Sequence, residues 1–328
     1  MKNNPPKKPR LLLTAGDPNG IGPEIILKIF NNNNFISKFD LTVVGSKSVF
    51  DFYASLLNIE SIPAGKIIEI SLPKKFITEP GKINKQSGKI SGDAVRIAAE
   101  LCINREYSGM ITLPISKEAL NLGGYNYPGH TEMLTELSGS ENTVMILYSK
   151  IFSTALVTGH LPLKDVSKKL KKELLISKII SVNNSLVRDF QLKNPKIALL
   201  SLNPHAGDNG LIGNEENEII NPVIEQLNSV GFNLRGAFAS DAFFATGNFK
   251  KFEITIAMYH DQGLIPFKMI SFDKGVNFTA GLNFVRTSPD HGTAFNIAGL
   301  GIANPESTKQ AILLAYRLAK RNTTMVLK

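Results

Sequence analysis

The chain has 328 residues, of which 43% are hydrophobic and 20% charged, and its formal net charge is +9. This balance is typical of a globular protein and excludes a disordered chain, and no apolar run approaches the roughly 20 residues that cross a bilayer, so no membrane partner is expected. The positive charges are spread along a chain without tryptophan, which argues against a nucleic-acid partner. The length exceeds one ordinary domain of about 150 residues, so two domains are expected.

The first ten residues carry four basic side chains and lack the apolar centre of a secretion signal. We therefore expect a cytoplasmic protein. The single cysteine, Cys102, lies in a helical pattern and is expected to be a small buried side chain. No disulfide can form within the chain.

Apolar runs typical of buried strands alternate with helical patterns. The predicted strands are 10–14, 41–44, 110–113, 154–158, 196–202 and 253–259. One helix is expected to begin at Gly22, with a proline in its first turn and the acid Glu24 beside it. This alternation predicts βα units and a largely parallel sheet, which is an α/β fold.

A glycine-rich turn, residues 15–22, follows the first predicted strand. Its glycines allow close backbone approach, and the N-terminus of the next helix favours an anion. The spacing matches neither the G-x-G-x-x-G dinucleotide fingerprint nor a P-loop. Residues 299–304 imitate the fingerprint but lack its last glycine. These motifs alone leave the cofactor open.

Three of the five histidines, His160, His205 and His260, each follow a predicted strand. Ligands of an α/β sheet collect at the carboxyl ends of its strands. Three neutral imidazoles with an open fourth position suit a catalytic divalent metal, with zinc as the first choice. A histidine at a strand end is often a hydrogen-bonded structural residue instead, and this alternative stays open.

Basic and polar side chains near these histidines are suited to an anionic substrate. They are Lys268, Asn277 and Arg286, together with a polar turn that contains His130 and Thr131. Arginine binds phosphate or carboxylate with two hydrogen bonds, and lysine adds a point charge. Because a lone lysine or arginine is usually solvated, only convergence on the metal would make these residues a site.

Six motifs occur in the same order as in the 4-hydroxythreonine-4-phosphate dehydrogenases, a family of pyridoxal phosphate biosynthesis, and the chain resembles that family from about Leu11 to its end. The motifs are TAGDPNGIGPE (14–24), PISK (114–117), GHTE (129–132), LNPHAG (202–207), MYHDQGL (258–264) and RTSPDHGT (286–293). The segment 290–305 also resembles the adenosine-binding loop of isopropylmalate and isocitrate dehydrogenases, which hold NAD or NADP without the usual glycine fingerprint.

The resemblance implies a homodimer whose active site is shared between subunits. Each subunit would have two α/β/α domains with a cleft between them, like isocitrate and isopropylmalate dehydrogenases. We place a cofactor-side domain at 1–125 plus 271–328, and a metal, substrate and dimerisation domain at 126–270.

The resemblance also assigns the ligands. His160 and His205 would bind the metal, with His260 contributed by the other subunit. The substrate would be held by His130, Thr131, Lys268, Asn277 and Arg286, and the cofactor by Asp290, His291, Gly292, Thr293 and Asn304.

The implied reaction is the oxidation of 4-phosphooxy-L-threonine by NAD or NADP, with zinc, magnesium or cobalt bound. The product, 2-amino-3-oxo-4-phosphooxybutanoate, then decarboxylates to 3-amino-2-oxopropyl phosphate. A general base must lie within reach of the substrate hydroxyl, and Asp241 and Asp261 are the candidates. Asp261 is equally suited to orienting an imidazole.

Three alternatives remain. A dehydrogenase of the same fold could act on a four-carbon sugar-acid phosphate, such as erythronate or threonate 4-phosphate. A metal-dependent phosphohydrolase could use the same histidines and cations without a nicotinamide. A binding protein on the same scaffold would have no activity.

Overall fold

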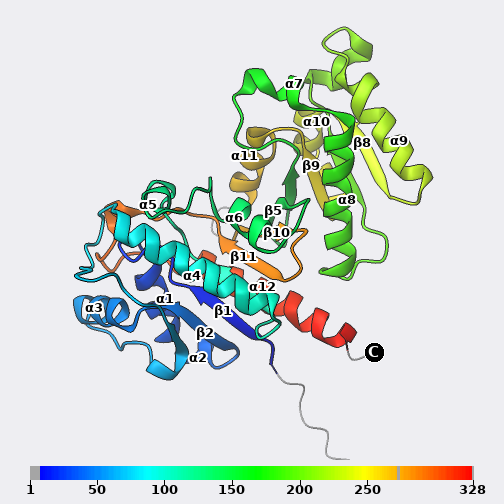
Figure 1. Cartoon of the computed structure of the whole chain (residues 1–328). Coiled ribbons are helices and arrows are strands. Elements are labelled where there is room, and N and C mark those ends of the chain that lie inside the picture. Colours follow the sequence, from blue (N-terminus) through cyan, green and yellow to red (C-terminus); the bar gives the residue numbers. More distant parts are fainter. Residues whose placement is uncertain (1–7, 272–273, 327–328) are drawn as a thin grey trace, which may run out of the picture. The chain divides into compact units, whose positions relative to one another are not determined.

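The computed structural model describes residues 8–271 and 274–326 and divides the chain into two compact units. Unit 1 comprises Met1–Ser140 and Leu282–Lys328, and unit 2 comprises Glu141–Gly281. Both boundaries lie later in the chain than the predicted ones, after residues 125 and 270. Figure 1 shows the elements of both units.

Packing explains where the boundaries fall. Helix α6 (His130–Leu137) packs on α4 (Lys85–Ile103), and Met133 of α6 lies in the same buried cluster as the apolar face of α4. Strand β10 (Val276–Ala280) pairs in antiparallel fashion with β5 (Val144–Tyr148). The segment before residue 141 therefore belongs to unit 1, and the segment up to residue 281 belongs to unit 2.

The sheet of unit 1 has the strand order β3-β2-β1-β4-β11, and every neighbouring pair is parallel. The strands are β3 (Ile67–Glu69), β2 (Asp40–Gly45), β1 (Arg10–Thr14), β4 (Gly109–Thr112) and β11 (Val285–Pro289). The observed β1 coincides with its prediction, and β2 and β4 agree to within one residue at each end. β3 and β11 were not predicted.

Helices cover both faces of this sheet. α4 packs on β1, β2 and β4, on the face that carries Leu12 and Met110. α12 (Glu306–Val326) packs on β4 and β11 from the opposite face, where the hydroxyl of Thr287 donates to the carbonyl of Ala311 at 2.9 Å. The other helices of unit 1 are α1 (Gly22–Phe30), α2 (Asn33–Ile36), α3 (Lys47–Leu57) and α5 (Lys117–Leu122).

The sheet of unit 2 has the strand order β10-β5-β6-β9-β7-β8. β5 is antiparallel to β10 and β6, and the remaining neighbours are parallel. Its further strands are β6 (Thr154–Leu156), β9 (Ile254–Ala257), β7 (Ile197–Leu200) and β8 (Leu234–Phe238). β6, β7 and β9 are shorter forms of predicted strands, whereas β5, β8 and β10 were not predicted.

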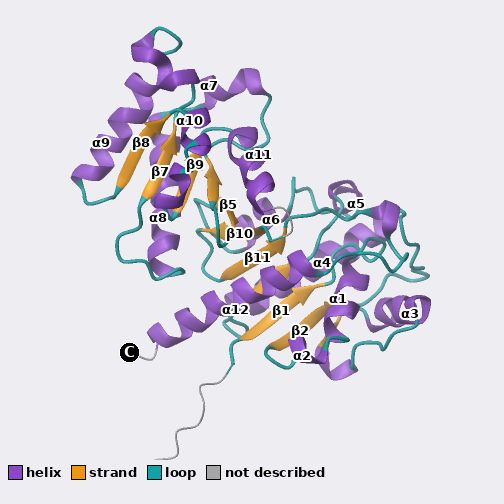
Figure 2. Ribbon diagram, turned by 180° about the vertical axis from the view of Figure 1, so that it is seen from behind, coloured by secondary structure: helices purple, strands orange, loops and turns teal. Residues whose placement is uncertain are grey.

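Unit 2 also has helices on both faces of its strands (Figure 2). α10 (Ser240–Ala245) and α11 (His260–Ser271) contribute Phe243 and Phe267 to one buried cluster. α8 (Lys172–Arg188) packs on β5 and β10, and α9 (Asn221–Ser229) packs on α8 and β8. Both units are thus helix–sheet–helix layers, which confirms the predicted α/β fold class.

Shorter helical segments complete the two units. They are α7 (Val166–Lys169), the 3-10 helices Ala64–Lys66, Leu163–Asp165, Pro204–Gly210, Asn248–Lys251 and Phe295–Ile297, and a π-helix at Glu216–Ile220. In the part of the chain that the structure describes, no helix combines the length and the apolar character needed to span a bilayer.

Gly88 marks the closest approach of α4 and α5, because a Cβ at this position would collide with the carbonyl group of Ala119. We expect Gly88→Ala to lower the free energy of unfolding by about 3 kcal/mol through overpacking. Gly65→Ala is the control, since a Cβ there meets nothing within 4 Å, and should change stability by less than about 0.5 kcal/mol. Urea denaturation measures both, and equal midpoints would contradict the expectation.

Candidate active site

The carboxyl ends of β6 and β9 bring two predicted metal ligands together. These strands are parallel neighbours, with Leu156 opposite Ala257, and His160 and His260 follow shortly after them. The centroids of the two imidazole rings are 5.6 Å apart. Two imidazoles on one tetrahedral ion have centroids about 5 Å apart. The pair therefore fits a shared divalent ion.

Buried hydrogen bonds fix these strand ends. Thr158 donates to the carbonyl of Met258 through its N–H at 3.2 Å and its hydroxyl at 2.6 Å. The side-chain oxygen of Gln262 accepts from the N–H of Met258 at 2.7 Å. Its Nε2 donates to the carbonyl of Ser201 at 2.6 Å and to the hydroxyl of Ser240 at 2.8 Å. One amide thus joins the ends of β9 and β7 to the start of α10.

Asp261 lies beside the ring of His260, with Oδ1 2.7 Å from Nδ1. A carboxylate in this place accepts the Nδ1 proton and leaves Nε2 free to bind a metal. The side chain of Asp261 is 70% exposed. Of the two roles considered for Asp261, this geometry favours the orienting one, and Asp241 on α10 remains the other candidate for the base.

His205 follows β7 on an unusual turn. Residues 205–209 are five consecutive residues with left-handed backbone angles, and four of them are not glycine. Each such residue costs about 1 kcal/mol or more. Backbone of this kind persists only where the surrounding contacts hold it, and it tends to occur at functional sites.

Glu216 supplies contacts at the start of this turn. Its buried carboxylate accepts from the N–H groups of Leu202 and Asn203 at 2.7 and 2.8 Å. It also accepts from Nδ2 of Asn203 at 2.9 Å. A Cβ on Gly207 would lie 2.7 Å from Oε2 of Glu216, so the turn passes close to this carboxylate and requires glycine there.

Within residues 8–271 and 274–326, no three His, Cys, Asp or Glu side chains form a group that could hold a metal ion. One chain thus brings His160 and His260 together without adding His205 to them. The resemblance implied that His160 and His205 bind the metal in one subunit and that His260 comes from the other. The distribution of the three ligands between subunits stays a prediction.

Three predicted substrate residues, His130, Thr131 and Arg286, lie in unit 1. Arg286 is on β11, is 2% exposed and donates from Nε and Nη2 to the hydroxyl of Thr112 at 3.0 and 2.6 Å. Burial lowers the pKa of Arg286 to about 10, and the charge of Glu132 opposes this shift. The guanidinium therefore remains charged at neutral pH.

His130 is the first residue of α6 and lies in the field of this guanidinium. Burial, and then the charge of Arg286, hold the pKa of His130 well below its ordinary value, so the ring is neutral. Its Nε2 is buried and has no hydrogen-bond partner among the described residues. Because Gly129 gives α6 no side-chain cap, the first N–H groups of the helix also favour an anion at this place.

The other two predicted substrate residues lie in unit 2. Lys268 is exposed on α11, the helix that begins at His260. Asn277 is on β10 opposite Leu147, and its Oδ1 is buried without a hydrogen-bond partner in the ranges that the structure describes. The predicted substrate residues are therefore divided between the two units.

The predicted cofactor segment runs from β11 to α12 in unit 1. His291 donates from Nδ1 to the carbonyl of Gly292 at 3.1 Å, which leaves Nε2 as an acceptor. Burial lowers the pKa of His291, so the ring is neutral. Its Nε2 is buried and lacks a hydrogen-bond partner within the described part of the chain. A buried acceptor of this kind suits the hydroxyl or amide groups of a dinucleotide.

Other members of this segment have structural contacts. The N–H of Asp290 donates to the hydroxyl of Ser307 at 3.1 Å, and Oδ1 of Asn304 accepts from the N–H of Glu306 at 2.9 Å. The amide of Asn304 thus caps the start of α12. The carbonyl of Thr293 accepts from the N–H of Ile21 at 3.0 Å.

The glycine-rich turn after β1 is a packed junction, although its glycines suggested an anion site. Asp17 is buried and accepts from the N–H of Asn19 at 2.9 Å and from the hydroxyl of Ser87 at 3.4 Å. The side chain of Asn19 donates to the carbonyl of Lys82 at 2.8 Å and accepts from the N–H of Glu79 at 2.9 Å. The turn therefore joins β1 to residues 79–82.

Sequence reasoning did not identify Gln262, Glu216 or Thr112 as residues that shape the site. Gln262 lies within the motif MYHDQGL, yet a glutamine just after a histidine and an aspartate is ordinarily solvated, so its three hydrogen bonds could not be expected. The only signal was its place directly after a strand end.

A solved structure defines the class of the chain. The 4-hydroxythreonine-4-phosphate dehydrogenase of Klebsiella pneumoniae matches it with a TM-score of 0.86 at 33% sequence identity, over 95% of this chain and 98% of that one. Similarity of fold and sequence at this level, over nearly the whole of both chains, makes the chain a dehydrogenase.

Sequence comparisons give the family. The family described as pyridoxal phosphate biosynthetic protein PdxA matches residues 37–315. The 4-hydroxythreonine-4-phosphate dehydrogenase of Sulfurihydrogenibium sp. is 42% identical over 323 residues, which cover 95% of this chain and 98% of that protein. The chain belongs to the PdxA family, and the resemblance found in the sequence is confirmed. A relative from Oceanobacillus iheyensis, provisionally named D-threonate 4-phosphate dehydrogenase, is 37% identical over 330 residues, covering 95% of this chain and 98% of the relative.

Asp17 should make stability depend on pH. Burial raises the pKa of Asp17 from 3.8 to about 6, and hydrogen bonds from Asn19 and Ser87 oppose this shift. Because the folded chain binds the proton more tightly than the unfolded chain, the contribution of Asp17 to stability falls as the pH rises from about 4 to 6. At pH 8, Asp17→Asn should be more stable than the original chain by up to about 3 kcal/mol. At pH 4 the difference should vanish.

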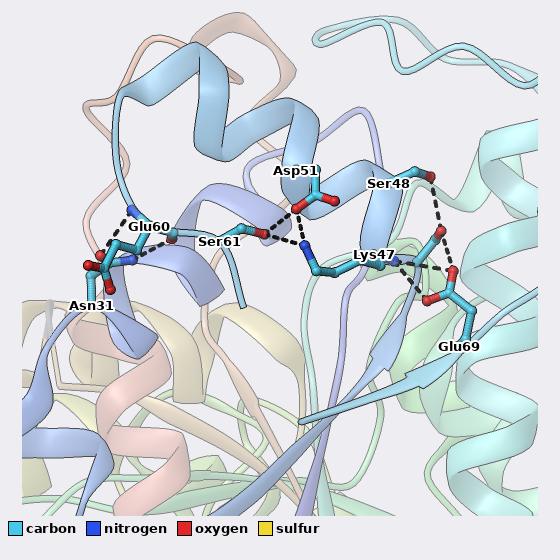
Figure 3. A network of polar contacts seen from close by, with 8 residues as sticks. Asn31, Lys47, Ser48, Asp51, Glu60, Ser61 and Glu69 are labelled. Carbon is cyan, nitrogen blue, oxygen red and sulfur yellow. Dashed lines mark hydrogen bonds and ion pairs between the residues drawn. The ribbon is translucent and has the colours of Figure 1, made fainter. Parts of the chain in front are cut away.

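Asp51 offers a control of opposite sign (Figure 3). Hydrogen bonds from Lys47 and Ser61 lower the pKa of its exposed carboxyl, so Asp51→Asn should lose a little stability at pH 8. Urea unfolding of the three proteins at pH 4 and pH 8 measures these differences. A gain for Asp17→Asn that is the same at both pH values would contradict the assignment of a buried charge.

Proposed function

We propose that the chain is an NAD(P)-dependent and divalent-metal-dependent 4-hydroxythreonine-4-phosphate dehydrogenase of pyridoxal 5'-phosphate biosynthesis. It oxidises 4-phosphooxy-L-threonine to 2-amino-3-oxo-4-phosphooxybutanoate, which decarboxylates to 3-amino-2-oxopropyl phosphate. One observation carries the proposal most directly. Three residues assigned to substrate or cofactor, His130, Asn277 and His291, each have a buried polar atom without a hydrogen-bond partner among the described residues.

The substrate is a phosphate ester with a carboxylate, and the residues of unit 1 suit such an anion. Arg286 is buried and remains charged, so it supplies a positive charge for the anion. The ring of His130 is neutral and therefore needs no counter-ion of its own. The uncapped N-terminus of α6 places N–H groups beside His130 and Thr131. In unit 2, Lys268 on α11 and Asn277 on β10 are the cation and the amide that the resemblance assigns to the substrate.

His160, His205 and His260 would hold the divalent ion. When bound, the ion supplies Lewis-acid polarisation of the substrate oxygens, and the nicotinamide accepts the hydride. Asp261 keeps the ring of His260 in the tautomer that leaves Nε2 free. Asp241, in the first turn of α10, is the candidate that removes the proton of the substrate hydroxyl.

A homodimer with a shared site accounts for the ligand geometry. The described residues of one chain bring two imidazoles together and form no three-residue metal group. A third imidazole from a second subunit would complete the set, so metal binding would depend on dimerisation.

A second candidate function is the oxidation of D-threonate 4-phosphate, because one relative that matches nearly the whole chain carries that name. This substrate has a hydroxyl group where 4-phosphooxy-L-threonine has an amino group. Both substrates need the same anion, metal and nicotinamide groups.

A direct assay separates the candidates. Purified protein should form NADH or NADPH, followed at 340 nm, with 4-phosphooxy-L-threonine and divalent metal, and should do so faster than with D-threonate 4-phosphate. Chelation should remove the activity, and added metal should restore it.

His205→Ala should lose bound metal and turnover while remaining a folded dimer. Phosphate release without nicotinamide reduction would identify a phosphohydrolase instead, and metal retention with normal turnover in His205→Ala would contradict its assignment.

Arg286→Lys tests the assigned anion group, because it keeps the charge and loses the fork. We expect the KM for the phosphorylated substrate to rise more than about tenfold, which corresponds to about 1.4 kcal/mol. The KM for NAD(P)+ should stay within about twofold. Arg96→Lys, on the exposed face of α4, is the control and should change neither constant. Equal increases in both constants for Arg286→Lys would refute the assignment.

A further inference from the structure

The first turns of α1 contain a partly buried ion pair that also binds a distant loop. Glu24 is 0% exposed, and its Oε1 accepts from Nζ of Lys28 at 2.9 Å. The same Nζ donates to the carbonyl oxygens of Gly301 and Ala303 at 2.8 and 2.7 Å. A lysine ammonium has three donors, and all three are used here.

The carboxylate of Glu24 binds the same two loop residues as a hydrogen-bond acceptor, whereas Lys28 binds them as a donor. It accepts from the N–H of Ala303 at 2.8 Å and from the N–H of Gly301 at 3.3 Å. The pair therefore holds both the N–H and the C=O groups of Gly301 and Ala303. Two apolar side chains of the same volume could not do this, because they neither donate nor accept.

The start of α1 also holds the other end of this loop. The N–H of Ile21 donates to the carbonyl of Thr293 at 3.0 Å. A Cβ on Gly20 would lie 3.1 Å from that carbonyl oxygen, so the two segments are in close contact. Residues 20–28 thus fix the loop at Thr293 and again at Gly301 and Ala303.

The loop presents groups suited to a ligand on its free side. Leu300 and Ile302 alternate with the two bound residues, and they are 63% and 64% exposed. His291, just before Thr293, has the buried Nε2 acceptor described above. Apolar surface and a neutral acceptor on one fixed loop match the ring and polar groups of a dinucleotide.

We propose that Glu24 and Lys28 are positioning residues for the nicotinamide dinucleotide. They hold residues 293–303 in the binding conformation before the dinucleotide arrives, so binding does not have to order the loop. This inference rests on the proposed function. Stability alone explains the pair poorly, since a buried ion pair is often no more stabilising than a well-packed apolar pair.

Two variants separate positioning from general stability. Glu24→Gln keeps the shape and removes the charge, so that an NH2 group faces the N–H of Gly301 or Ala303. Lys28→Met keeps the aliphatic stem and removes all three hydrogen bonds, and its partly exposed side chain makes it the safer variant for folding. Binding of NAD+ and NADP+ to the full chain is measured by calorimetry, loop order by amide hydrogen exchange, and substrate KM by the assay above.

We expect both variants to bind the dinucleotide about tenfold more weakly. Amide exchange at Gly301 and Ala303 should accelerate in both variants. In Glu24→Gln these N–H groups lose the carboxylate that accepts from them, and in Lys28→Met the loop carbonyls lose their donor, so the loop is held less firmly. Exchange in β1 and β4 should not change, and the KM for the phosphorylated substrate should stay within about twofold.

Lys47→Met is the matched control (Figure 3). Lys47 also pairs with an acid four residues away in unit 1, Asp51, but this pair binds Ser61 and does not contact the loop. The proposal is overturned by faster loop exchange with unchanged dinucleotide affinity, by equal losses for dinucleotide and substrate, or by an equal effect of Lys47→Met. If the original chain binds neither NAD+ nor NADP+, the proposed function fails and the positioning role falls with it. Normal binding by both variants defeats only the positioning role.

Discussion

The side-chain amide of Gln262 is the contact on which the end of unit 2 that carries the predicted metal ligands depends. Its three hydrogen bonds join the end of β9, the end of β7 and the start of α10. Peptide groups at strand ends lose their ladder partners, and leaving such a buried group unpaired costs about 1–3 kcal/mol. An amide has both a donor and an acceptor, so one residue satisfies several of these groups. The position of His260 two residues earlier follows from this arrangement.

Glu216 and Glu24 also pair backbone groups that would otherwise lack partners, and they do so with a charged side chain. Each is a buried carboxylate that accepts from two backbone N–H groups of a loop that carries predicted ligands. Such charge-assisted bonds are short and directional. They fix a loop more firmly than apolar packing, which has no preferred direction. Buried carboxylates thus hold a loop in each unit through hydrogen bonds from its backbone N–H groups.

The sequence predicted the elements with strong local signals. β1 was found at its observed bounds because four consecutive apolar or β-branched residues follow Arg10 and a glycine turn ends it. β11 was missed because Arg286, Thr287 and Ser288 make a buried strand look polar. β8 was missed because it carries exposed residues and a glycine. In both cases tertiary packing makes the segment a strand, and the local residue pattern does not indicate this packing.

The candidate site was predictable to a similar degree. Strand-end reasoning suggested that the histidines converge, and the structure brings two of them, His160 and His260, to 5.6 Å. The order β6-β9-β7 that makes these two neighbours could not be read from the sequence, because it depends on pairing between distant segments. Likewise Glu24 was recognised only as an acid at a helix start, which a solvated residue would equally explain. Its burial requires the loop that comes more than 270 residues later.

Buried polar atoms that lack a hydrogen-bond partner distinguish candidate binding loops from loops whose polar groups are paired within the chain. The turn that contains Asp17 and Asn19 is rich in glycine, but the buried side chains of both residues find their partners within the chain, so nothing there calls for an anion. His130 and His291 differ, since each has a buried ring nitrogen without such a partner among the described residues. Some threonine hydroxyls share this condition, yet a hydroxyl rotates toward any weak acceptor, whereas a ring nitrogen has one fixed direction. A fixed and neutral ring nitrogen without a partner is therefore the stronger indication of a binding site, and His130 and His291 lie in the segments to which the resemblance assigns the substrate and the dinucleotide.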